Sequence, residues 1–257
     1  MRVYGKNVTE QIIKKENVKR AYIYKNYKCK NIIDTLRDNK VQIKFLDKRA
    51  LDRIENGLHQ GIILEIDDYS YSSLDELGDV IVVLDHLEDP HNFGAIIRTV
   101  EAAGFDSIII PKDRSVDVNS TVVKVSVGSI ENVKIAKVRN ITQTIKDLKE
   151  MGYWVIGTDM NGTDYRNIDY CGKIVIVIGN EGKGMSRLVK ENCDFISSIP
   201  MRGKVNSLNA SVAAALVIYE AVKARVWWYK WLWTIRYGLW QWNGDRSPIW
   251  KIQTYDN

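Results

Sequence analysis

The stretch from Ile174 to Ser186, I-V-I-V-I-G-N-E-G-K-G-M-S, decides how this chain folds. A run of apolar residues leads directly into a loop with glycines at positions 179, 182 and 184. A second polar stretch, I-P-M-R-G-K-V-N-S-L-N-A-S, follows at residues 199–211. Together the two stretches predict a strand, a tight loop, a strand, a loop and a helix. Because ligands of an open α/β sheet bind beyond the carboxyl ends of its strands, these loops are the first place to look for chemistry.

The same pattern extends outward over residues 78 to 226. Apolar runs without strict alternation suit strands that are buried on both faces, and such runs occur at residues 80–84, 107–110, 133–138, 154–158, 173–178 and 195–199. Helical periods occur at residues 92–103, 141–151 and 207–226. We therefore predict the α/β fold class for this region, with a mostly parallel sheet covered by helices.

The first part of the chain repeats this alternation on a smaller scale. Strands are predicted at residues 18–24, 41–45 and 61–66, and helices at residues 32–39 and 48–54. A polar, serine-rich stretch, D-D-Y-S-Y-S-S, follows at residues 67–73 and indicates a linker. We predict a small N-terminal α/β domain over residues 1–68, a linker over residues 69–77 and a second domain over residues 78–226.

The tail over residues 227–257 differs in composition from the rest. Seven of the eight tryptophans lie between Trp227 and Trp250, and neither a helical nor a strand period organises them. The segment could be an aromatic surface that docks a partner or a membrane. We favour the alternative that it never evolved with this fold, and we place no function there.

The composition is that of an ordinary soluble globular protein, with 45% apolar and 27% charged residues. A formal charge of +5 permits nucleic-acid binding without requiring it. Cys29, Cys171 and Cys193 are widely spaced and form no C-x-x-C pair, so a disulfide framework or zinc knuckle is not indicated. There is no apolar leader at the start and no run of ~18 apolar residues that could span a membrane. We expect a cytoplasmic protein without a membrane segment.

Three familiar motifs are incomplete in this chain. The loop from Gly179 resembles the phosphate-binding pattern G-x-x-x-x-G-K-[ST], but Met185 stands where that pattern needs its lysine. The glycine spacing is also wrong for a dinucleotide-binding G-x-G-x-x-G. His86 and His91 lack the spacing of a zinc site and are expected to be hydrogen-bonded surface groups. We expect neither a bound nucleotide triphosphate nor a metal ion.

A third polar segment, D-P-H-N-F-G-A-I-I-R-T-V-E-A-A-G, runs from Asp89 to Gly104. Asn92 is a candidate helix N-cap, because its side-chain carbonyl can accept a free backbone N–H. Arg98 lies six residues further along the predicted helix. A lone helical arginine is usually solvated, so this segment is weak by itself.

In this order and spacing, the three segments resemble the signature motifs of the SPOUT methyltransferases, specifically the SpoU-type RNA ribose 2′-O-methyltransferases. The matching patterns are N-x-G-x-x-x-R, then G-N-E-G-x-G after a strand, then I-P-M-x-G-x-V-x-S-L-N-x-S. Residues 3–67 resemble the small, ribosomal-protein-like substrate-binding domain that is common in the family members acting on ribosomal RNA. The resemblance implies a trefoil knot in the C-terminal half of the second domain, a homodimer, and S-adenosylmethionine bound within the knot.

The resemblance also implies which residues form the site. The catalytic group would be Asn92, Arg98, Glu181, Ser207 and Asn209. The cofactor pocket would be lined by Thr158, Gly179, Gly184, Ile199, Met201 and Leu208. From the residues alone, other roles stay open: Ile199 and Leu208 could be core, Glu181 could cap the next helix, and Ser207 or Asn209 could cap theirs. Arg98, a poor base because a guanidinium holds its proton tightly, would gather a phosphate and stabilise the developing alkoxide.

Basic residues interleave with tyrosines near the first predicted strand, which is typical of RNA-binding surfaces. The candidate RNA-binding residues are Lys19, Arg20, Lys25 and Lys28. Tyr22 and Tyr24 share one strand face and could equally be core.

The resemblance implies methyl transfer from S-adenosylmethionine to a ribose 2′-hydroxyl, most readily on a guanosine of 23S ribosomal RNA. One alternative is a transfer-RNA 2′-O-methyltransferase, although those enzymes tend to lack the N-terminal module. Another is a non-catalytic RNA-binding protein of the same fold.

Overall fold

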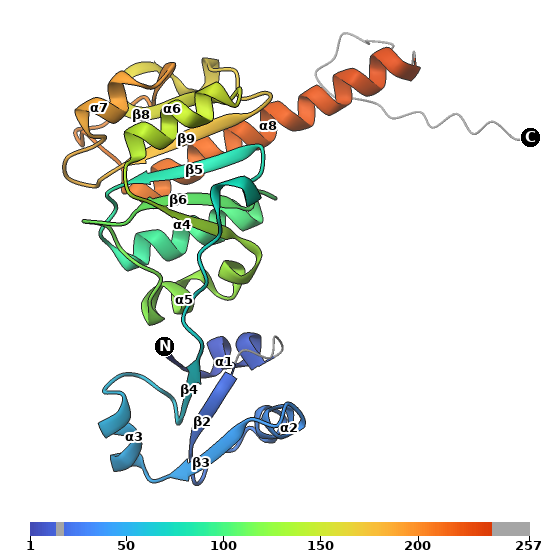
Figure 1. The fold of residues 1–257 in the computed structure, drawn as a ribbon, viewed down its shortest axis with the longest axis vertical. Coiled ribbons are helices and arrows are strands. Elements are labelled where there is room, and N and C mark those ends of the chain that lie inside the picture. The colour runs from blue at the N-terminus through green and yellow to red at the C-terminus, as the bar shows by residue number, and fades with distance from the viewer. Residues whose placement is uncertain (14–17, 238–257) are drawn as a thin grey trace, which may run out of the picture.

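The computed structural model describes residues 1–13 and 18–237, with the backbone alone over residues 226–237, and Figure 1 shows its two α/β units. The N-terminal unit is a four-stranded sheet in the order β1-β4-β2-β3. Its elements are β1 Arg2–Tyr4, α1 Lys6–Ile12, β2 Val18–Tyr24, α2 Lys30–Asp38, β3 Gln42–Leu46, α3 Lys48–Ile54 and β4 Ile62–Ile66. The neighbours β2 and β3 are parallel, whereas β4 runs antiparallel to both β1 and β2.

The larger unit is a six-stranded sheet in the order β10-β8-β9-β5-β6-β7, and every neighbouring pair in it is parallel. Its strands are β5 Val80–Asp85, β6 Ser107–Pro111, β7 Lys134–Val138, β8 Trp154–Asp164, β9 Ile174–Gly179 and β10 Phe195–Ser198. Its α-helices are α4 Pro90–Ala102, α5 Ser120–Ser126, α6 Ile141–Glu150, α7 Arg187–Glu191 and α8 Ala210–Tyr237. The predicted α/β class with a mostly parallel sheet is confirmed.

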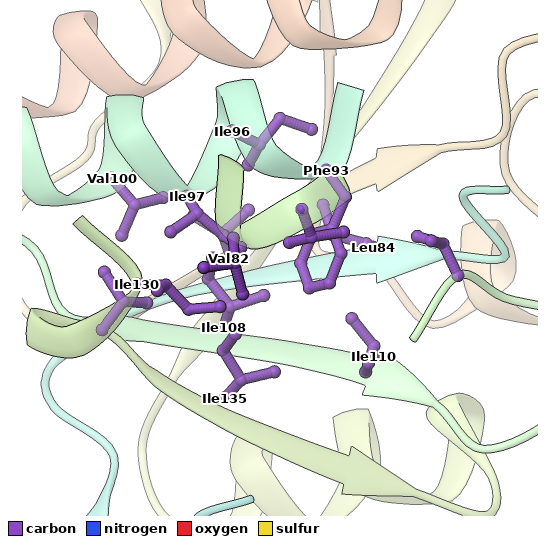
Figure 2. Packing of buried hydrophobic residues seen from close by; sticks show 14 of the residues in the cluster. Val82, Leu84, Phe93, Ile96, Ile97, Val100, Ile108, Ile110, Ile130 and Ile135 are labelled. Atoms are coloured by element: carbon purple, nitrogen blue, oxygen red, sulfur yellow. The ribbon is translucent and has the colours of Figure 1, made fainter. Parts of the chain in front are cut away.

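Burial on both faces explains why the central strands are continuous apolar runs. One face of the sheet packs on α4, and Figure 2 shows Phe93, Ile97 and Val100 of that helix against Val82 and Ile108 of the strands. The other face packs on α6 through Ile141, Ile145 and Leu148. Side-chain caps begin several helices, as Asn140 does for α6 by accepting from the Gln143 N–H at 3.1 Å.

The segment between the two units is held against the larger sheet. Ser72 forms a parallel bridge with Ala136 of β7. The Tyr69 hydroxyl donates to the Val133 carbonyl at 2.8 Å, and the Tyr71 hydroxyl accepts from the Val118 N–H at 3.1 Å. Burial raises the pKa of Tyr69 to about 12. The segment predicted as a linker therefore packs against the larger unit through defined contacts. The division of the chain into its domains stays a prediction.

Several sequence predictions need correction at their ends. The last helix begins at Ala210, not at residue 207, because Asn209 accepts from the Ser211 N–H at 2.9 Å and so occupies the capping position. Its backbone continues helically to Tyr237, past the predicted end at residue 226 and into the tryptophan-rich segment, whose sequence shows no helical period. Predictions for residues 238–257 lie outside the described residues.

Short elements escaped prediction from sequence. These are β1, α1, α5 and α7, each of seven residues or fewer, which is too short for a period to emerge. Across the described ranges 1–13 and 18–237, no helix combines the length and apolarity that crossing a membrane would require.

Candidate functional site

The two loops singled out in the sequence lie at the carboxyl edge of the larger sheet. Because β10, β8, β9 and β5 are neighbours in that order, the residues that end these strands lie side by side. Gly179 at the end of β9 is in register with Asp85 at the end of β5. Thr158 reaches across from β8, and its hydroxyl donates to the Val177 carbonyl at 2.9 Å. Ile199, directly after β10, is half-buried against the core.

The glycine loop, defined as residues 179–186, closes on itself. The Asn180 N–H donates to the Gly184 carbonyl at 3.0 Å, and the Gly184 N–H returns a bond to the Asn180 carbonyl at 2.9 Å. Gly184 has a φ of 66°, a conformation that suits glycine. At Gly179 a Cβ would lie 2.4 Å from the Gly184 carbonyl carbon. The turn is therefore tight enough to exclude any side chain at position 179.

Three polar side chains from distant parts of the sequence meet beside this loop. The Asn92 amide nitrogen donates to Glu181 Oε1 at 2.9 Å, across 89 residues of sequence. Asn209 donates its own amide nitrogen to Asn92 Oδ1 at 2.9 Å, across 117 residues. Asn92 is only 7% exposed, whereas Glu181 and Asn209 reach solvent. We refer to Asn92, Glu181 and Asn209 as the amide–carboxylate cluster.

Asn92 is not the helix N-cap that the sequence suggested. The N-cap of α4 lies three residues earlier, at Asp89, which accepts from the His91 N–H at 2.8 Å, and Pro90 is the first residue of the helix. Proline is well suited to that position because its missing N–H would have no helical partner. With capping assigned to Asp89, the Asn92 amide is left to contact Glu181 and Asn209.

Arg98 lies outside the amide–carboxylate cluster. Six residues of α-helix turn the side-chain direction by about 600°, so Arg98 and Asn92 project from different sides of α4. The Arg98 side chain is exposed and forms no ion pair with any residue that the structure describes. Glu181 therefore contacts Asn92 and not Arg98.

The third segment presents its side chains outward. Ser207 is exposed and has no hydrogen-bond partner among residues 1–13 and 18–237. Leu208 is 36% exposed and Val205 is 62% exposed, so neither is a core residue, while Met201 is half-buried. Exposed apolar side chains next to a glycine loop form a surface that would receive a planar, weakly polar group such as a nucleobase.

The four candidate RNA-binding residues fall into two pairs. Lys19 forms an ion pair with Asp67, whose hydrogen bond raises the pKa of the lysine, and Arg20 lies 3.6 Å from Glu65. Lys25 and Lys28, in contrast, are exposed beyond the carboxyl end of β2 without an acidic partner in the described chain. Tyr22 and Tyr24 are half-buried on the face of β2 opposite its core residues.

Sequence reasoning missed how three residues, Asp85 among them, support the glycine loop. Asp85 is 1% exposed and accepts from the Ser186 N–H at 2.6 Å. His86 Nδ1 lies 2.6 Å from Asp85 Oδ1, so this histidine is hydrogen-bonded, as expected. Asn180 Nδ2 donates to the His86 carbonyl at 2.8 Å. The signal that could have found them is the carboxylate that ends the apolar run V-I-V-V-L-D. Within the described ranges, no three His, Cys, Asp or Glu residues gather to hold a metal ion.

Known protein families match both units of this chain. The model of the SpoU rRNA Methylase family matches residues 79–219, and the model of RNA 2′-O ribose methyltransferase substrate binding matches residues 2–72. Fold and site together place the protein in the class of SPOUT-type RNA methyltransferases.

Individual relatives and solved structures show which proteins of this class the chain resembles. "Putative TrmH family tRNA/rRNA methyltransferase YacO" of Bacillus subtilis is 40% identical over 87% of this chain and 95% of its own length. The AdoMet-bound rRNA methyltransferase of Sinorhizobium meliloti superposes with a TM-score of 0.73 at 25% identity, over 86% of each chain. The SpoU methyltransferase AviRb of Streptomyces viridochromogenes shares the fold, with a TM-score of 0.75 at 24% identity over 88% and 90% of the two chains. The chain belongs to the SpoU rRNA methylase family, whose members methylate RNA.

Proposed function

We propose that this protein transfers the methyl group of S-adenosylmethionine to a ribose 2′-hydroxyl of RNA, with a guanosine of 23S ribosomal RNA as the target. The observation that carries the proposal is the amide–carboxylate cluster, held beside the glycine loop at the carboxyl edge of the sheet. Its three members come from the three segments that define the family resemblance. A match to a substrate-binding model over residues 2–72 supports an RNA substrate.

S-adenosylmethionine fits the residues present. The exposed apolar Leu208 and the half-buried Met201 and Ile199 would hold its adenine, while Thr158, Gly179 and Gly184 leave their backbone groups close to it. When bound, its sulfonium supplies an already activated methyl group, so the chain itself needs no metal. Holding the acceptor hydroxyl collinear with that methyl contributes on the order of 7–11 kcal/mol to lowering the barrier.

The amide–carboxylate cluster positions the ribose. One Asn92 N–H donates to Glu181, and Asn92 Oδ1 accepts from Asn209. The second Asn92 N–H is left to donate to a ribose oxygen. Ser207, exposed beside Asn209, provides a further hydroxyl. Arg98 approaches from solvent, where it binds an RNA phosphate and stabilises the alkoxide as the hydroxyl proton leaves to water.

We also propose the trefoil knot. Strand β10 pairs with the far end of β8, where Ser198 is in register with Asp164. A Cβ at Gly162 would lie 2.4 Å from the Ile196 carbonyl oxygen, so β8 and β10 are closely packed at this point. Helix α8 then returns against α4 and β9. A chain end threaded through the loop after β8 accounts for all these contacts.

A homodimer is the assembly that we propose. Val212, Leu216 and Tyr219 are 47%, 37% and 49% exposed along one face of α8, and with Tyr165 they line a shallow apolar hollow. We expect Leu216→Glu to weaken self-association by roughly 30-fold, about 2 kcal/mol, as loss of a central interface side chain does. Light scattering across a concentration series measures this change. Met151→Glu, at another exposed apolar residue, is the control, and equal dimerisation of both variants contradicts this interface.

The exposed lysines after β2 should bind the RNA backbone. The logarithm of the RNA association constant falls as the logarithm of the salt concentration rises. We expect the double variant Lys25→Ala/Lys28→Ala to make this slope less steep by about 1.4, which is about 0.7 for each phosphate of single-stranded RNA that is no longer neutralised. Filter binding at several salt concentrations measures that slope, and the affinity for S-adenosylmethionine should not change. Lys146→Ala, at an exposed position of α6, serves as a charge control. An unaltered slope would remove Lys25 and Lys28 from the interface. Lys19 and Arg20 would contribute less, because acidic neighbours already pair with them.

Transfer RNA is the second candidate substrate, since relatives carry the name tRNA/rRNA methyltransferase. Ribosomal RNA is favoured because the TrmH/SpoU tRNA modifying enzyme of A. aeolicus superposes on only 60% of this chain, with a TM-score of 0.54 at 32% identity. The test is label transfer from S-adenosylmethionine to 23S, 16S and transfer RNA, followed by mapping of 2′-O-methyl positions. Label on a base, or none on any RNA despite binding, would overturn the proposal; the latter result identifies a non-catalytic RNA-binding protein. We place the activity in the cytoplasm, where these RNAs are modified.

A further inference from the structure

Strand β5 ends in a buried carboxylate. Val80 to Leu84 are all apolar and buried, and Asp85 follows them with only 1% of its surface exposed. Removing an ionised carboxylate from water is costly unless hydrogen bonds replace the lost hydration. Such a group is too deep to touch RNA, so any effect it has on the site must act through its neighbours.

Asp85 is placed to hold both ends of the glycine loop. Its Oδ2 accepts from the Ser186 N–H at 2.6 Å, at the end of the loop. Its backbone is in register with Gly179, at the start of the loop. Its Oδ1 lies 2.6 Å from Nδ1 of His86 and accepts from that ring when Nδ1 carries the proton.

His86 extends the contact to the tip of the loop. Its carbonyl accepts from Asn180 Nδ2 at 2.8 Å, and Asn180 Oδ1 accepts from the Gly182 and Lys183 N–H groups at 3.0 and 3.2 Å. His86 has a φ of 61°, in the left-handed region that non-glycine residues rarely adopt. Glu181 lies between Asn180 and Gly182, so these bonds fix the backbone that carries the carboxylate facing Asn92.

We propose that Asp85 is a positioning residue: through Ser186 and His86 it holds the glycine loop so that Glu181 stays within hydrogen-bond distance of Asn92. No bond to substrate forms or breaks at Asp85. The catalytic consequence rests on the proposed methyl transfer, whereas the clamp on the loop is a property of the fold alone. The two parts therefore have separate measurements.

The experiment compares Asp85→Ala with Asp85→Asn. Alanine removes both acceptors, and we expect kcat for methyl transfer to fall by ~100-fold, as a misplacement of about 1 Å does, with little change in KM for RNA. Asparagine keeps the size and can still accept from Ser186 through its Oδ1, while its amide donates to a neutral His86 Nδ1. It should recover most of the lost kcat. Amide hydrogen exchange at Gly184 and Ser186 should accelerate in the alanine variant and much less in the asparagine variant.

Ser107→Ala is the matched control. Ser107 is a buried polar residue at the opposite edge of the same sheet, where its hydroxyl accepts from the Gly78 N–H at 2.8 Å. Its loss destabilises the sheet without touching the loop, so kcat and loop exchange should stay near those of the parent. Unchanged loop exchange in Asp85→Ala overturns the clamp, whether or not the parent methylates RNA. Faster exchange with unchanged kcat overturns the positioning role, and a parent that transfers no methyl group overturns only the proposed function.

A second variant keeps the clamp testable if Asp85→Ala fails to fold. Ser186→Pro removes the N–H that donates to Asp85 and puts the proline Cδ where the Asp85 carboxylate now lies, so this contact is lost. The φ of −63° at Ser186 is one that proline adopts. We expect faster amide exchange at Gly184 in this variant and a lower kcat. Exchange at Gly184 equal to that of the parent would overturn the clamp.

Discussion

Arg98→Ala should reduce kcat for methyl transfer by about 10²–10³, the loss typical of removing one group that stabilises transition-state charge. A guanidinium holds its proton too tightly to act as the base, so the effect should come from lost stabilisation of the alkoxide and of the phosphate beside it. RNA binding should largely persist, because one phosphate contact among many is removed. Single-turnover label transfer from S-adenosylmethionine, alongside filter binding, separates the two effects.

Because Arg98 is exposed, its substitution should change methyl transfer with little effect on folding. An exposed side chain without an ion pair in the described chain contributes little to folding, and its removal should change the free energy of unfolding by less than ~0.5 kcal/mol. Arg98→Lys is the matched variant, since it keeps the charge and loses the planar fork. Intermediate activity in the lysine variant indicates that both charge and fork matter. Undiminished transfer by Arg98→Ala would show that the alkoxide is stabilised elsewhere.

Gly179→Ala should abolish high-affinity binding of S-adenosylmethionine. The new Cβ would lie 2.4 Å from both the Gly184 carbonyl carbon and the Met185 nitrogen. Both are backbone atoms, so relief requires the whole loop to move. We expect a loss of ~100-fold in affinity and a fall of about 1–3 kcal/mol in the free energy of unfolding from overpacking. Calorimetric titration and urea denaturation measure the two quantities.

Gly172→Ala provides the comparison for stability. Its Cβ would meet nothing within 4 Å, but its φ of 75° strains any side chain. That strain should lower stability by about 1 kcal/mol or somewhat more, while cofactor affinity is retained because Gly172 lies at the amino end of β9, away from the carboxyl edge. Normal cofactor binding by Gly179→Ala would mean that the glycine loop does not line the pocket.

Most of the architecture was accessible from local pattern. The strand predicted at residues 18–24 matches β2 Val18–Tyr24, and the helix predicted at 48–54 matches α3 Lys48–Ile54. The runs that became β5 and β9 were continuous and apolar because both faces of the central strands are buried. Short elements such as α7 escaped prediction because one turn of helix carries no period. The true start of α4 escaped because Asp89 and Asn92, three residues apart, are both good caps.

The site was only partly accessible in this way. The motifs identified the residues of the site but not the contacts between them. The roles proposed for these residues stay predictions. The motif placed Arg98 and Asn92 in one group, whereas the helical turn between them separates the exposed guanidinium from the buried amide. Asp85 belonged to none of the motifs, and its contact with the glycine loop became visible only from its burial and its bond to Ser186.

By itself, the sequence determined the longer strands, the main helices, the glycine loop and the family, because each strand, helix and motif depends on residues that are close together in the chain. Tertiary structure alone decided that Asn92 meets Glu181 and Asn209 across 89 and 117 residues. Those meetings depend on the strand order β10-β8-β9-β5-β6-β7. Each parallel strand could pair with any other of similar pattern, and only the packing of the complete sheet and its helices selects one order.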